Sequence, residues 1–67
     1  MLITLDPSST APIYEQIAAS IRGSIAAGDI AGGAELPATR TLAKALGVNM
    51  HTVLRAYGEL RDDGIIE

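Results

Sequence analysis

The segment from residue 39 to 60, TRTLAKALGVNMHTVLRAYGEL, constrains the fold more than any other part of the chain. Within it, Ala43, Gly47 and Val53 stand four and six residues apart. Ala43 is small enough for one helix to cross closely over another, and Gly47 can take the left-handed conformation that ends a helix. Val53 returns an apolar side chain into the angle between the helices. This spacing predicts a helix-turn-helix, a motif whose second helix usually enters the major groove of DNA.

A longer helix is predicted upstream, from about 12 to 27. Four isoleucines recur at every fourth residue and form its buried stripe: Ile13, Ile17, Ile21 and Ile25. Pro12 suits the first turn, where its missing N–H costs nothing, and Gly28 is a natural stop. Gly23 inside the helix costs about 1 kcal/mol relative to alanine, so we expect close packing at this position.

Two further helices are expected within the helix-turn-helix. The first runs from about 39 to 46, with Ala38 or Thr39 at its cap. The second runs from about 50 to 63, and Asn49 is a favoured residue for its N-cap. At 100° per residue, its apolar side chains cluster on one side, which must face the core. The residues that form this buried side of the motif are Leu42, Leu46, Val48, Val53, Ala56, Tyr57 and Leu60.

Outside the helices, we expect a short extended segment at 2–5, a turn at Gly32-Gly33, and β segments at 34–36 and 65–67. The chain of 67 residues makes one small domain. It has no cysteine, which excludes a disulfide framework and a thiolate metal site. No run approaches the length of a transmembrane helix, and a signal peptide is not evident, so a cytoplasmic protein is the default expectation.

The distribution of charge matters more than the net charge of −3, which by itself argues against nucleic acid. No acidic residue occurs between Glu35 and Glu59. The basic residues of that interval are Arg40, Lys44, His51 and Arg55. The helix-turn-helix is therefore a locally basic part of an acidic chain, although three cations in this window are also compatible with chance. Binding by one copy is expected to be weak and sensitive to salt.

The predicted third helix carries the candidate binding residues. His51 and Arg55 fall nearly opposite its core side, and Thr52 lies at the flank. Arginine suits guanine or phosphate, whereas histidine and threonine suit base edges or phosphate. Met50 and Leu54 also lie off the core side. They are compatible with contacts to thymine methyl groups, with cover by a neighbouring surface, or with simple partial burial.

Two other classes of function are alternatives to DNA binding. Enzymatic chemistry is not expected, because the single histidine, His51, has no cysteine or paired carboxylates near it in sequence. Asp62 and Asp63 are interpreted as solvated residues and not as metal ligands, and no cofactor is expected. The serious alternative is a protein-interaction module without DNA readout, which the acidic balance and the apolar Met50 and Leu54 favour.

From Pro12 onward, over about 56 of the 67 residues, the chain resembles the N-terminal winged helix-turn-helix domain of GntR-family bacterial transcription regulators. The matching segments are PIYEQIAASIRGSIAAGDI, GGAELPATRTLAKALGVN and TVLRAYGELRDDGIIE. The form TVxRAYxEL is similar to the YtrA-type and MocR-type branches. The N-terminal LITLDPSSTAPIYEQI favours the YtrA type.

The resemblance implies a mainly α fold, a three-helix winged helix-turn-helix with short β segments. It spans 12–67, with 1–11 as an N-terminal extended segment. Relatives continue into a second wing strand and an effector or dimerisation domain, so we expect the wing to be incomplete and this chain to be a piece of a longer regulator. The implied function is sequence-specific binding of double-stranded DNA, with the helix of about 50–63 in the major groove. A palindromic operator and a homodimer formed largely outside this chain are also implied, and the effector is unknown.

The resemblance also assigns DNA contacts to particular residues. Arg40 occupies the arginine of the L-P-x-x-R-x-L motif, and Arg55 matches that of the RAY motif. Many relatives have arginine where this chain has Met50, and another where it has Leu54. The candidate DNA-binding residues are Thr39, Arg40, Lys44, Asn49, Met50, His51, Thr52 and Arg55.

Overall fold

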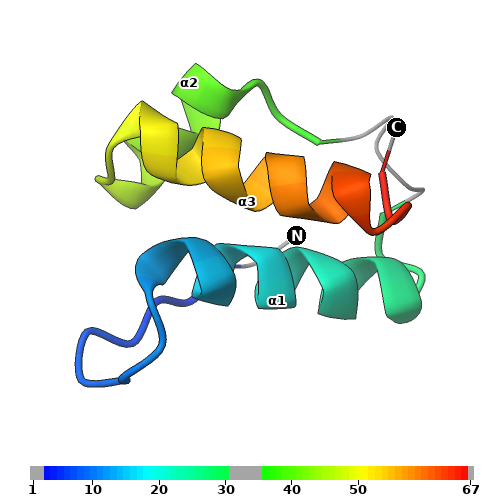
Figure 1. Cartoon of the computed structure of the whole chain (residues 1–67), viewed down its shortest axis with the longest axis horizontal. Coiled ribbons are helices and arrows are strands. Elements are labelled where there is room, and N and C mark those ends of the chain that lie inside the picture. Colours follow the sequence, from blue (N-terminus) through cyan, green and yellow to red (C-terminus); the bar gives the residue numbers. More distant parts are fainter. Residues whose placement is uncertain (1–2, 31–35, 67) are drawn as a thin grey trace.

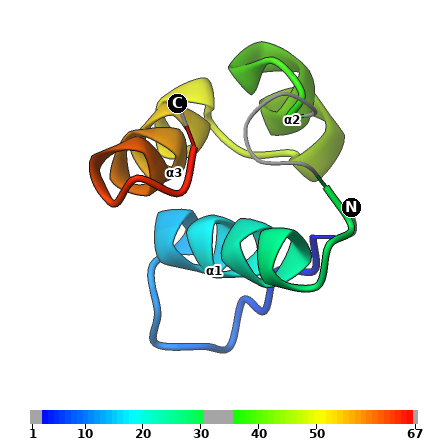
Figure 2. The ribbon, with the colours of Figure 1, turned by 90° about the vertical axis from the view of Figure 1, so that its right-hand side faces the viewer.

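The computed structural model describes residues 3–30 and 36–66, which contain three helices. They are α1 (Ile13–Ala26), α2 (Thr39–Leu46) and α3 (Met50–Asp62). α1 and α3 run side by side in the same direction, and α2 lies beside α3 (Figure 1). Seen along α1, the three helices form a triangle (Figure 2). α3 packs against both other helices, so the three-helix arrangement predicted from the sequence is confirmed.

The isoleucine stripe of α1 supplies one half of the core. Ile17 and Ile21 are fully buried, with exposed fractions of 0%, and Ile13 and Ile25 pack against the cluster from its edges. The helix begins one residue later and ends one residue earlier than expected. Gly28 follows it with a φ of +78°, the left-handed conformation that ends a helix.

The turn between α2 and α3 has the geometry that its sequence predicts. Gly47 adopts φ 69° and ψ 33°, and the N–H of Val48 donates to the carbonyl oxygen of Ala43 at 3.0 Å. This hydrogen bond satisfies a carbonyl group that the end of α2 would otherwise leave unpaired. Asn49 then caps α3, because its Oδ1 accepts a hydrogen bond of 2.8 Å from the N–H of His51.

The buried face of α3 is the other half of the core. Val53, Ala56 and Leu60 have exposed fractions of 0%. Tyr57 is buried through its ring, and its hydroxyl donates a 2.8 Å hydrogen bond to the carbonyl oxygen of Pro37. That bond ties the segment before α2 to α3. Burial also raises the pKa of the Tyr57 hydroxyl above its usual value of 10.0.

The side chain of Gln16 holds the segment that precedes α1. Its Oε1 accepts from the N–H of Asp6 at 2.8 Å, and its Nε2 donates to the carbonyl oxygens of Asp6 at 3.1 Å and Ala11 at 3.0 Å. Ile3 and Leu5 consequently pack against the core. Ser8 donates from both its hydroxyl and its N–H to the carboxylate of Asp6, and these bonds lower the pKa of that carboxyl group.

The expectation of β structure is not met where the structure can test it. No strand occurs within residues 3–30 and 36–66. The N–H groups of Ile65 and Ile66 donate to the carbonyl oxygen of Leu60, at 2.8 and 3.4 Å, and Ile66 joins the core. These amides close the end of α3, so neither is free to pair with another strand. Leu36 is likewise outside any strand. Residues 2, 32–35 and 67, on which the other parts of these predictions fall, lie outside the described residues.

The predicted close packing at Gly23 is wrong. The residue is exposed on α1, and a Cβ atom added there would meet no heavy atom within 4 Å. Gly23 therefore carries the entropic cost of glycine in a helix without an internal packing reason for it.

Replacing the two glycines by alanine should change stability in opposite directions. Gly23→Ala should raise the free energy of unfolding by about 0.5–1 kcal/mol, because alanine favours the helix and the space is open. Gly47→Ala should lower it by about 1–2 kcal/mol, because φ there is 69°. Urea denaturation of both variants beside the parent chain measures these changes, and two changes of the same sign would contradict the assignment.

Stability at high pH should depend on Tyr57. The folded state holds the phenolic proton more tightly than the unfolded state, so this contribution is complete below pH about 10 and is lost as the pH rises through the folded-state pKa. Tyr57→Phe should cost about 1 kcal/mol at neutral pH, because it removes the bond to Pro37. It should also flatten the fall in stability above pH 10. Denaturation at a series of pH values tests both statements, and an unchanged alkaline slope in the variant would refute the second.

Candidate nucleic-acid interface

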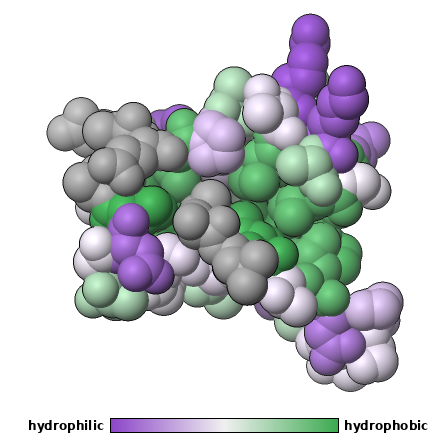
Figure 3. Space-filling view, turned by 180° about the vertical axis from the view of Figure 1, so that it is seen from behind, coloured by the Kyte–Doolittle hydropathy of each residue, from purple (hydrophilic) through white to green (hydrophobic). Residues whose placement is uncertain are grey.

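Exposed basic side chains occur on α2 and in the first turn of α3, two helices that pack against each other. Arg40 and Lys44 are exposed on α2, and His51 is exposed in the first turn of α3. The space-filling view shows hydrophilic side chains projecting from this corner (Figure 3). We call the surface formed by Arg40, Lys44 and His51 the basic corner. Three of the residues that the sequence predicted to contact DNA are therefore exposed on adjoining helices.

The N-cap of α3 determines how its first turn is presented. Asn49 is exposed, and its Oδ1 is occupied by the N–H of His51. Its side-chain amide nitrogen is the group left for a ligand. The capping bond thus stabilises the first turn of α3, so Asn49 has a structural role in addition to any contact with a ligand.

The other predicted residues near the corner are less accessible. Thr39 begins α2 and is half-buried, as is Thr52 on α3. Met50 is half-buried against the core, whereas Leu54 is 44% exposed. Partial burial is therefore the correct interpretation for Met50 but not for Leu54.

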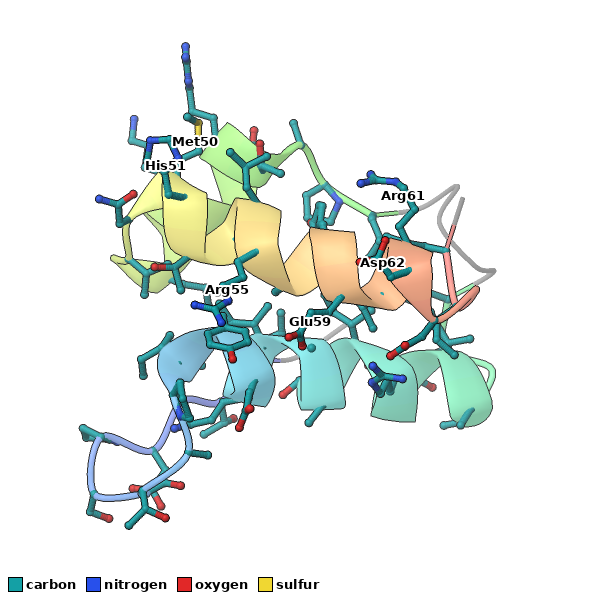
Figure 4. All side chains as sticks on the ribbon, viewed as in Figure 1. Met50, His51, Arg55, Glu59, Arg61 and Asp62 are labelled. Carbon is teal, nitrogen blue, oxygen red and sulfur yellow. The ribbon has the colours of Figure 1, made fainter. Side chains whose placement is uncertain are left out.

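Arg55 follows His51 by one turn of α3, but its guanidinium group is turned toward α1. Its guanidinium carbon stands 3.9 Å from the centroid of the Tyr14 ring, a cation–π contact between α3 and α1. Figure 4 shows Arg55 turned toward α1, while Met50 and His51 project from the opposite edge of α3. Arg55 is exposed, as predicted, and its guanidinium group is directed away from the His51 side chain (Figure 4). Its partner is the aromatic ring of Tyr14.

The charge of α3 changes sign along the helix. No acid occurs from Met50 to Gly58, whereas Glu59 and Asp62 occupy its C-terminal half (Figure 4). Beyond the helix, Asp63 forms an ion pair with Arg22 of α1, so it is not the simply solvated residue that the sequence suggested. With Arg61 between Glu59 and Asp62, the C-terminal half keeps a net negative charge, so the N-terminal half is the part of α3 better suited to an anionic partner.

Sequence reasoning missed Tyr14 and Gln16 as residues that organise this surface. Both lie in the segment PIYEQI, next to the isoleucine stripe. Tyr14 holds Arg55, and Gln16 holds the chain before α1. Periodicity marks Tyr14 as a neighbour of the buried stripe, but nothing in the sequence pairs it with an arginine 41 residues away.

No metal site is formed by the part of the chain that the structure describes: it contains no cluster of three or more histidine, cysteine, aspartate or glutamate side chains that could hold an ion. Among the same residues, no helix is both long and apolar enough to cross a membrane.

Comparison with known proteins identifies the family of this chain. The family model for bacterial regulatory proteins of the gntR family matches residues 13–67. The chain belongs to the GntR family. It is 42% identical over 66 residues to the HTH-type transcriptional repressor YtrA of Bacillus subtilis, covering 98% of this chain and 51% of that protein. It is 33% identical over 66 residues to the probable rhizopine catabolism regulatory protein MocR of Rhizobium meliloti, covering 98% of this chain and 13% of the relative.

Solved structures agree with this membership. YtrA from Sulfolobus acidocaldarius, a GntR-family transcription factor, superimposes with a TM-score of 0.89 at 48% identity, over 96% of this chain and 68% of that one. A GntR family transcriptional regulator from Listeria monocytogenes gives a TM-score of 0.81 at 41% identity, over 94% of this chain and 54% of that one. The predicted family and YtrA-type similarity are confirmed, as is the mainly α fold class.

These relatives are named as transcription regulators and not as enzymes, in agreement with the prediction. The chain spans about half the length of YtrA from Bacillus subtilis and about an eighth of MocR. The contacts of individual residues with DNA stay predictions.

Two substitutions at Asn49 should separate its capping role from a binding role. Asn49→Ala should lower the free energy of unfolding by about 1 kcal/mol, because the N–H of His51 loses its acceptor. Asn49→Asp keeps an acceptor and should retain stability, but it replaces an amide donor by a negative charge next to the basic corner. Thermal denaturation and DNA binding of both variants form the test. Equal stability of the alanine and parent chains would contradict the cap.

Proposed function

We propose that this chain is the DNA-binding domain of a bacterial transcription regulator and binds double-stranded DNA in a sequence-specific manner. The observation that carries the proposal is the basic corner, in which Arg40 and Lys44 of α2 and His51 of α3 are exposed together. The N-terminal half of α3 enters the major groove, and its acidic C-terminal half stays outside. Membership of the GntR family supports this proposal.

In this arrangement, the basic side chains divide between positioning and readout. Arg40 and Lys44 contact phosphates and set the register of α2 on the duplex. Arg55, held toward α1, contacts the backbone on the other flank of α3. His51, the amide of Asn49 and the hydroxyl of Thr52 supply hydrogen bonds for base edges. Three phosphate contacts correspond to a slope of about −3 in log K against log salt concentration.

The functional unit that we propose is a two-fold dimer on a palindromic operator. Its half-sites lie about 34 Å apart, one turn of the double helix. Residues largely outside this chain make the dimer interface. The regulator acts in the cytoplasm, where bacterial DNA lies, and its effector is unknown.

The protein-interaction module is the second candidate, and the exposed Leu54 favours it. The two functions differ in what α3 contacts. If Met50 and Leu54 form an interface between proteins, Met50→Ser with Leu54→Ser should abolish self-association and leave any DNA binding unchanged. Sedimentation of the parent and the double variant distinguishes the candidates.

The function is tested by selecting bound duplexes from a random DNA pool at low salt. Enrichment of a short motif supports sequence-specific binding, and a palindromic motif supports the dimer. A chain that is folded by circular dichroism but enriches no motif would overturn DNA readout by this chain.

Arg40→Ala should weaken binding to the enriched duplex and reduce the salt slope by about 0.9, because one phosphate contact is lost. The matched control is Arg61→Ala, which removes the same charge near the end of α3, away from the basic corner. The control should keep the parent slope. Binding titrations at several salt concentrations provide the comparison, and equal slopes for all three chains would contradict the role of Arg40.

A further inference from the structure

We propose that α3 recognises the C5-methyl groups of thymine through Leu54 and Met50; this inference rests on the proposed binding of DNA. The operator would then present thymines to the N-terminal half of α3, and apolar contact would supply part of the specificity. The chemistry on which this depends is the thymine methyl, an apolar group that B-DNA exposes in its major groove.

The exposed face of α3 is partly apolar where it would enter the groove. Leu54 is 44% exposed, whereas Met50, one turn earlier on the same side, is half-buried. At 100° per residue, Leu54 lies between Met50 and His51 around the helix. The backbone positions of the three residues are therefore neighbours on α3, with Leu54 in the middle.

Arg55, the arginine in the N-terminal half of α3, is directed away from the surface around Leu54 (Figure 4). Guanine is most often recognised by a bidentate arginine or lysine. Arg55 is stacked 3.9 Å from the centre of the Tyr14 ring and is turned away from Met50 and His51 (Figure 4). The Oδ1 of Asn49 caps α3 at 2.8 Å. The surface around Leu54 is therefore better suited to an apolar contact with a base than to a bidentate hydrogen bond.

The surroundings of Leu54 favour DNA over a second copy of this chain as the occupant. The basic corner lies beside it, and no acid occurs between Glu35 and Glu59. DNA complements this pattern, because phosphates line the groove and methyl groups lie within it. A second copy placed face to face would bring like charges together. A stable dimer also needs about 800 Å² from each partner, roughly a fifth of the 4211 Å² surface of this chain, which two side chains do not supply.

The test compares the selected duplex made with thymidine and the same duplex made with deoxyuridine, which lacks the C5-methyl group. For the parent chain, each contacted methyl should contribute about threefold to fourfold in affinity. Leu54→Ala should lose most of the difference between the two duplexes. The matched control, Arg40→Ala, should bind both duplexes more weakly and keep their ratio.

The outcomes separate this inference from the proposed function. Equal affinity of the parent chain for both duplexes would overturn thymine-methyl recognition and leave DNA binding in place. An undiminished ratio in Leu54→Ala would overturn it as well, because the preference would then come from other residues or from DNA shape. A selected motif without thymine would also overturn thymine-methyl recognition. A folded parent chain that bound neither duplex would instead overturn the proposed function, and the inference with it.

Discussion

The packing of α3 between α1 and α2 is the constraint on which the rest of the structure depends. Val53 and Leu60 are fully buried on one side of α3, and Ile17 and Ile21 are fully buried on α1. Full burial of side chains of this size is worth roughly 1.5–3 kcal/mol each. Rotation of α3 about its axis would expose this row, so the core determines which of its residues face outward. The orientation of His51 and Leu54 is therefore a consequence of packing on the opposite side.

The lysine and arginine residues between Glu35 and Glu59 depend on two different contacts of the fold. Arg40 and Lys44 belong to α2, and their position depends on the turn at Gly47. Arg55 belongs to the contact between α3 and α1, and its position depends on the ring of Tyr14. A helix placed in a groove has a phosphate backbone on each flank. Under the proposed function, each group would contact one backbone, so a net charge of −3 is compatible with an anionic partner.

The sequence predicts the local features of this structure well and the contacts between distant residues poorly. The left-handed Gly47 and the capping Asn49 act within four residues, so residue type alone indicates their roles. The isoleucine stripe follows from the period of the helix. In contrast, the stacking of Arg55 on Tyr14 joins two helices, and no pattern along the chain specifies it. The expected strand at Ile65 failed because a nearby carbonyl group, that of Leu60, takes its amide.

The hydrogen bonds of Gln16 have a consequence for the chemical ageing of the protein. Both donors of its amide nitrogen are directed at carbonyl oxygens, those of Asp6 and Ala11. Deamidation would convert this side chain into a carboxylate, which has no proton to give at neutral pH. Two attractive contacts would then become two contacts between oxygen atoms of like partial charge. The segment that carries Ile3 and Leu5 would keep the bond from the N–H of Asp6 but lose the two bonds that the amide nitrogen donates, although every apolar residue of the core would be unchanged.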